Sequence, residues 1–194
     1  MEHKAKLKDG TDVVIRELTI DDLEKSIAFF KALPKEDRIY LRVDVTKPEN
    51  VENRIKMIKF GEVMRLVAII DDEIVADGAL ELETEEWEEH MAEIRLIVAH
   101  PYQRRGLGMI MARELFALAS GRNVEEIVVK FMEPQSSARK VFEKLGFHED
   151  SVLHNYVKDI DGIKHDLVLM RCDLKSLWEK LDDYISNFDW QRTR

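Results

Sequence analysis

The chain has 194 residues, of which 39 are acidic and 30 basic, and its formal net charge is −9. Its length and its 45% hydrophobic content predict one folded domain and exclude disorder throughout, while a single cysteine excludes an internal disulfide. The acidic balance argues against a nucleic-acid partner. The sequence has no apolar run of the roughly 18–20 residues that span a membrane, and its first residues are too polar for a secretory signal. It therefore predicts a cytoplasmic protein with no membrane association.

The first half of the chain predicts a strand, two helices and a β-hairpin. Thr19 is a candidate N-cap for a helix that ends before Pro34, and Pro48 opens a second helix that ends at Gly61. Two apolar runs separated by the acidic residues 71–73 are typical of a hairpin. The segment 36–43 fits either a short helix or a loop. The expected strands cover 13–16, 64–70 and 74–82, and the expected helices cover 19–33 and 48–60.

The second half continues the alternation of strands and helices. Gly121 and Gly146 end two helices, and Asp161 with Gly162 forms a turn between two strands. This order predicts an α/β or α+β domain with a mixed sheet, because it is not a simple repeat of βαβ units. The expected strands cover 92–99, 127–131, 147–152, 156–160 and 167–172, and the expected helices cover 106–120 and 136–145.

A helix is expected after residue 172, capped by Asp173. One apolar stripe follows at helical spacing, so residues 173–194 form an amphipathic helix appended to a domain of residues 1–172. The stripe packs on that domain or forms a homodimer contact. It contains Leu174, Leu177, Trp178, Leu181, Ile185 and Phe188.

The loop between the strand at 92–99 and the next helix has the strongest chemical signal. Gly106 and Gly108 allow a ligand to approach the backbone, and the first amides of a helix point outward with no intrahelical partner. With Arg104 and Arg105 nearby, the loop predicts a phosphate or pyrophosphate site. A tight turn with exposed arginines is the alternative. A dinucleotide-binding loop fits poorly, because Met111 occupies the third glycine position.

The segment from Gln103 to Gly108 resembles the Gln/Arg-x-x-Gly-x-Gly/Ala motif of the GNAT family of acetyl-CoA-dependent N-acetyltransferases. The order of elements from 12 to 171 and the segment Lys144–Phe147 are also similar to that family. The resemblance implies a mixed, mostly antiparallel sheet flanked by helices. More narrowly, the chain resembles the GNAT domains of bacterial protein lysine acetyltransferases, in which a glutamate lies ten residues before the motif, as Glu93 does here.

This resemblance implies how acetyl-CoA is bound. Backbone groups of the strand would hold the pantetheine arm, and the loop amides would hold the pyrophosphate. Many members have an asparagine and a tyrosine where this chain has Gln135 and Phe142. Gln135 can still bind the cofactor, but Phe142 cannot protonate the leaving thiolate, which leaves water, Tyr156 or no acid. The implied contacts are Leu96, Ile97 and Val98 for pantetheine, and Gln103, Arg104, Arg105, Gly106, Leu107 and Gly108 for the pyrophosphate.

Glu93 is the candidate general base for the acceptor amine, and metal binding is not expected. Burial and neighbouring carboxylates from Glu81 and Glu83 would strengthen it as a base, while a salt bridge to Arg95 is the alternative role. The acidic run at 81–89 is either a solvated face or attracts a cationic acceptor. The acceptor is an amine on a small molecule, a protein lysine or an N-terminus. A catalytically silent acyl-CoA-binding domain and a nucleotide-binding oxidoreductase are the competing functions.

Overall fold

The computed structural model describes residues 2–178, apart from the side chains of Lys59, Phe60 and Ser137. Within these residues eight strands form one sheet in the order β1-β2-β3-β4-β5-β6-β8-β7. Every neighbouring pair is antiparallel except β5 and β6, which are parallel, so the predicted mixed, mostly antiparallel sheet is confirmed. The strands are β1 (Glu2–Lys6), β2 (Asp12–Glu17), β3 (Val63–Ile70), β4 (Glu73–Leu82), β5 (Met91–Val98), β6 (Glu126–Met132), β7 (His148–Lys158) and β8 (Lys164–Asp173).

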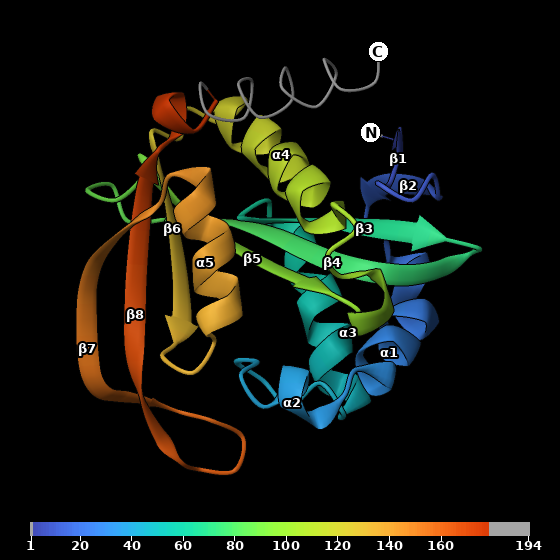
Figure 1. The fold of residues 1–194 in the computed structure, drawn as a ribbon, viewed down its shortest axis with the longest axis horizontal. Coiled ribbons are helices and arrows are strands. Elements are labelled where there is room, and N and C mark those ends of the chain that lie inside the picture. Colours follow the sequence, from blue (N-terminus) through green and yellow to red (C-terminus); the bar gives the residue numbers. More distant parts are fainter. Residues whose placement is uncertain (1, 179–194) are drawn as a thin grey trace.

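Helices cover both faces of the sheet (Figure 1). Alternate residues of a strand face opposite sides, so Leu66 joins the core under α4 and α5, whereas Val67 joins a second core under α1 and α3. None of the described helices is both long and apolar enough to cross a membrane. The α-helices are α1 (Leu23–Ala32), α2 (Lys35–Arg38), α3 (Pro48–Lys56), α4 (Leu107–Ser120) and α5 (Ser136–Leu145), and the 3₁₀ helices are η1 (Ile20–Asp22), η2 (Met57–Phe60) and η3 (His100–Tyr102).

The β3–β4 hairpin forms where the sequence predicts it. Asp71 and Asp72 both have positive φ, of 50° and 66°. Two consecutive residues in this region are the signature of the tight turn whose twist matches that of two antiparallel strands. The hairpin places β4 in the middle of the sheet, next to β5. Close contact between β4 and α4 depends on Gly78, since a Cβ there would lie 2.9 Å from the side chain of Leu115.

Two elements differ from the predictions, and one open alternative is resolved. The strand β1 was not expected, because its sequence is polar and its side chains are largely exposed. The segment 36–43, which fitted either a short helix or a loop, has both, because α2 ends in it at Arg38 and a loop follows. The two strands expected at 147–152 and 156–160 are one strand, β7, whose pairing with β8 shifts register between Leu153 and Val157. That irregularity explains why the sequence pattern looks interrupted although the strand continues.

The described residues include only the beginning of the C-terminal segment. Residues 174–178 are helical, and Asp173 caps them by accepting a hydrogen bond from the amide of Ser176 at 2.8 Å. Leu174 and Leu177 are buried in the core that contains α4. The indole of Trp178 donates to the hydroxyl of Ser120 at the end of α4, at 2.6 Å. The remaining stripe residues, Leu181, Ile185 and Phe188, lie outside the described residues, so the domain division stays a prediction.

An ion pair joins β2 to the start of α1. The Arg16 guanidinium donates two hydrogen bonds of 2.7 Å to the Asp22 carboxylate, which also accepts from the Thr19 amide at 2.9 Å. These hydrogen bonds, that of Arg16 first, lower the pKa of Asp22 from 3.8 to about 2. Because the folded pKa lies below the unfolded one, the pair stabilises the fold above about pH 4, and this contribution is lost as the pH falls towards 2.

We expect Asp22→Asn to lower the free energy of unfolding by about 1–2 kcal/mol at pH 7, because the guanidinium loses a charged partner in a partly exposed pair. Urea unfolding at pH 7, 4 and 2.5 measures the effect, and the difference from wild type should shrink at the lowest pH. Asp21→Asn, at an exposed position of the same turn, should change stability by less than about 0.5 kcal/mol. A pH-independent loss at Asp22 would contradict the assignment.

Candidate active site

A cleft opens where β5 and β6 separate. Their parallel pairing runs only from Met91 opposite Glu126 to Glu93 opposite Val128. Beyond that point the two strands diverge, as Figure 1 shows, and a cavity of about 120 Å³ lies between them. The second half of β5 therefore keeps β4 as its neighbour and has the cleft on its other edge.

The cleft passes through the sheet from one face to the other. Ile94 and Leu96 face the core under α4 and α5, whereas Arg95 and Ile97 face the opposite side, yet all four line the cavity. Side chains of α5 close it on the first side, and the loop after α2, with Arg42, closes it on the second. Two molecules that enter from opposite faces can therefore meet in the gap between β5 and β6.

The loop after β5 leads into the N-terminus of α4. Arg104 and Gly106 both have positive φ, of 61° and 90°, and Gly106 is the N-cap of the helix without any side-chain hydrogen bond. The first amides of α4 thus lack an intrahelical or side-chain cap, and the helix dipole favours an anion there. A Cβ at Gly108 would lie 3.9 Å from Val98 and 4.0 Å from Leu96, which places the helix start beside the end of β5.

Two predicted phosphate-site side chains hold the loop in place. The Gln103 side-chain amide donates to the carbonyl of Val98 at 3.0 Å, across the turn from strand to loop. The Arg105 guanidinium pairs with the Asp9 carboxylate at 3.0 Å, and the Arg105 carbonyl accepts from the amide of Lys8 at 3.0 Å. The turn between β1 and β2 therefore supports the loop. Of the two arginines in the loop, Arg105 is thus paired with a carboxylate.

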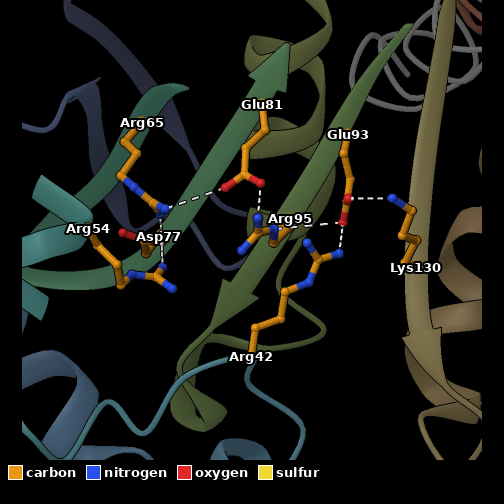
Figure 2. A network of polar contacts seen from close by, with 8 residues as sticks. All are labelled: Arg42, Arg54, Arg65, Asp77, Glu81, Glu93, Arg95 and Lys130. Atoms are coloured by element: carbon orange, nitrogen blue, oxygen red, sulfur yellow. Dashed lines mark hydrogen bonds and ion pairs between the residues drawn. The ribbon is translucent and has the colours of Figure 1, made fainter. Parts of the chain in front are cut away.

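Glu93 is buried and surrounded by cations (Figure 2). Its side chain is 4% exposed, and its carboxylate pairs with Arg42, with the Lys130 ammonium at 3.0 Å and with Arg95 at 3.7 Å. Glu81 lies directly opposite Glu93, as the prediction of neighbouring carboxylates required. Glu81 itself, however, pairs with Arg95. The expected like-charge environment is therefore wrong, because cations lie between and around the two carboxylates.

A second part of the same network lies on β3 and β4. The Asp77 carboxylate accepts from Arg54 of α3 at 3.0 Å and from Arg65 of β3 at 3.1 Å. Arg65 also lies 3.7 Å from a carboxylate oxygen of Glu81, which joins the two parts. Asp77 pairs in register with Val67 and Ile97, which belong to the core under α1 and α3, so its carboxylate lies on that face of the sheet and makes this side of the cleft strongly polar.

Positive charge exceeds negative charge in this network. Five of its members are basic and three are acidic. Burial, and then the positive charges of Arg42 and Arg65, lower the pKa of the Arg95 guanidinium to about 9. Burial also lowers the pKa of Arg54. At neutral pH both remain cationic, and their mutual repulsion is only partly balanced by the carboxylates. Of the acidic run at 81–89, Glu81 is the member that belongs to the described network, and it pairs with Arg95, so the network itself does not provide acidic surroundings for a cationic acceptor.

The other expected residues differ in where they lie. Gln135 lines the cleft, and its side-chain oxygen accepts from the amide of Met132 at 2.8 Å. Phe142 also lines it and packs between Phe131 and Phe147. Tyr156 does not, because it lies on the edge strand β7, is 66% exposed and is separated from β5 by two strands. The tyrosine that lines the cleft is Tyr40, from the loop after α2.

Most of the basic network is not evident from the sequence. A signal exists for three members, since Arg65, Asp77 and Lys130 are each charged residues with uncharged neighbours on both sides in a largely apolar strand. A charge in such a position is rarely buried without a partner. No comparable signal marks Tyr40 and Arg42, because they belong to a segment whose structure was left open.

Comparison with known proteins agrees with this architecture. A family model described as the acetyltransferase (GNAT) family matches residues 30–147. The chain belongs to this family. Among solved structures, this acetyltransferase is similar to the GNAT domain of PAT from S. lividans, with 20% identity, a TM-score of 0.74, and coverage of 89% of this chain and 96% of that one. No curated protein sequence matches the chain at a significant level.

Two further structures share the fold of this acetyltransferase. The ribosomal-protein-alanine N-acetyltransferase from Brucella melitensis has 21% identity and a TM-score of 0.71, covering 82% of this chain and 98% of that one. RimJ from Mycobacterium smegmatis, in complex with CoA-disulfide, has 16% identity and a TM-score of 0.73, covering 94% and 93%. At these identities the likeness concerns the fold.

Proposed function

We propose that this acetyltransferase moves an acetyl group from acetyl-CoA to a primary amine by direct attack. The observation that carries the proposal is the cleft through the sheet. Two contacts support it: Arg42 and Lys130, which line the cleft, pair with the buried Glu93 carboxylate, and Gly108 at the start of α4 lies beside Leu96, another lining residue. An anionic donor and an amine acceptor can then approach from opposite faces.

The residues around the loop fit the donor. The amides from Gln103 to Gly108 would hold the pyrophosphate, because Gly106 provides the left-handed turn and Gly108 leaves room over the end of β5. The edge of β5 at Leu96, Ile97 and Val98 would bind the pantetheine arm as a sheet edge binds an added strand. This edge is available because β5 pairs with β6 only at residues 91–93. Bound acetyl-CoA supplies the thioester carbonyl that the amine attacks.

Glu93 would orient the acceptor and take its proton. A lysine-type amine is mostly protonated at neutral pH and must lose a proton before its nitrogen can attack. The ammonium first gives one proton to the Glu93 carboxylate. The new C–N bond then forms as the C–S bond breaks, and the nitrogen loses its second proton to water. Arg42 is the partner that the amine can displace, because its side chain is 42% exposed and comes from a loop. The thiolate then takes a proton from water or from Tyr40.

Two measurements test this function together. Calorimetry should detect binding of acetyl-CoA, and a thiol reagent should detect free CoA when acetyl-CoA meets a panel of amines. A silent acyl-CoA-binding domain would bind the donor and release no thiol with any amine. An oxidoreductase would bind NAD and not CoA. The family match and the acetyltransferase names of the neighbours favour release.

A further inference from the structure

The acceptor side of the cleft contains an unusual arrangement of charge. The charged groups lie on the face of the sheet away from α4, where Arg42, Arg95 and Lys130 surround Glu93. An acceptor that is only a cation would enter a site that already holds more basic than acidic groups. Electrostatic repulsion would oppose it, because charges in a partly buried site are weakly screened.

The carboxylates of the network are already shared between cations. One oxygen of Asp77 accepts from both Arg54 and Arg65. Within residues 2–178, the buried Nε of Arg95 has no hydrogen-bond partner and lies 3.7 Å from the nearest Glu93 oxygen. Guanidinium groups form their strongest pairs with carboxylates and phosphates through two parallel hydrogen bonds. The network therefore has unused capacity for an additional anion.

The Arg42–Glu93 pair can be exchanged for a zwitterion. Glu93 is fixed on the central strand β5 and is 4% exposed, whereas Arg42 reaches it from the loop after α2 (Figure 2). If an ammonium takes the place of Arg42 at Glu93, the displaced guanidinium needs a new anion. A carboxylate on the same acceptor supplies that anion, so no charge is left unpaired in the cleft.

We infer that the acceptor is a small primary amine that carries an anionic group, in the manner of an amino acid. Its amine binds Glu93, and its carboxylate or phosphonate binds Arg42 and Arg95. The inference rests on the proposed acetyl transfer and narrows its substrate class. It replaces the expectation that an acidic site attracts a purely cationic acceptor.

A matched set of acceptors tests the anionic group. L-Amino acids are compared with their carboxamides, their decarboxylated amines and their aminophosphonate analogues, together with an amidated peptide that contains lysine. CoA release is followed at saturating acetyl-CoA. We expect kcat/KM for at least one free amino acid or aminophosphonate to exceed that of its carboxamide by about tenfold or more, mainly through KM. The two anionic series distinguish a carboxylate from a phosphonate.

Variants of Arg42 connect this preference to the cleft. Arg42→Gln should reduce the preference over the carboxamide to about threefold or less, and Arg42→Lys should retain more of it because the charge remains. Arg122→Gln is the matched control, since Arg122 is exposed beyond the end of α4 and the preference should be unchanged. Equal rates for the carboxamides, or a preferred peptide, would overturn this inference and leave acetyl transfer intact. No thiol release with any amine would overturn acetyl transfer itself.

Discussion

Replacing Glu93 by glutamine is expected to lower kcat for acetyl transfer by about tenfold or more, because general-base groups typically contribute at least this factor. The dissociation constant for CoA should change by less than about twofold, since the carboxylate pairs with Arg42, Arg95 and Lys130 and not with the loop at the start of α4. Calorimetry with CoA and thiol release at saturating acceptor measure the two quantities. The residual rate should rise with pH as more of the amine becomes neutral.

The buried ion pairs make a structural control necessary. Glu93→Gln leaves three cations without their carboxylate, and we expect a loss of about 1–3 kcal/mol in stability, because two of them can turn to solvent. Glu81→Gln removes the facing carboxylate of the same network, which pairs with Arg65 and Arg95. It should cost similar stability and lower kcat less than about threefold. If both variants lose kcat equally, Glu93 is a structural ion-pair residue and not the base.

The elements were predictable where local chemistry determines them. Asp71 and Asp72 adopt the positive φ of a hairpin turn, and Gly106 begins α4 in the conformation for which glycine is favoured. The motif and the strand before it could be read as a ligand loop from residue types alone. The polar strand β1 could not be predicted from the sequence, because it is held by pairing with β2 and not by burial of its own side chains.

The cleft and its charges depend on tertiary structure. The sequences of β5 and β6 do not indicate that the pairing of the two strands ends at Glu93 and Val128, yet the separation beyond these residues creates the cleft. The carboxylate of Glu81 could be placed beside Glu93 from strand alternation, and this was correct. The like-charge effect does not arise, because Glu81 pairs with Arg95 and because Arg42, 51 residues away in sequence, pairs with Glu93. The sign of the net charge around a site can therefore be predicted only from the fold, even when the acidic residues are evident in the sequence.

Gly108→Asp is expected to weaken CoA binding by about 100-fold, which corresponds to about 2.7 kcal/mol. Gly108 is the second residue of α4, where the helix amides would face the pyrophosphate. A carboxylate there repels the phosphates and competes for the same amides. The new side chain has space, since a Cβ at this position meets nothing closer than 3.9 Å. Calorimetric titration with CoA measures the loss.

The sign of the stability change distinguishes this effect from damage to the fold. An aspartate in the first turn of a helix interacts favourably with the helix dipole, so thermal unfolding without CoA should show equal stability or a gain of about 0.3–1 kcal/mol. Gly108→Asn is the matched control, because it has nearly the same size and no charge, and it should weaken CoA binding by less than about tenfold. Equal losses for asparagine and aspartate would indicate a steric block. Unchanged affinity in both variants would place the phosphates away from the start of α4.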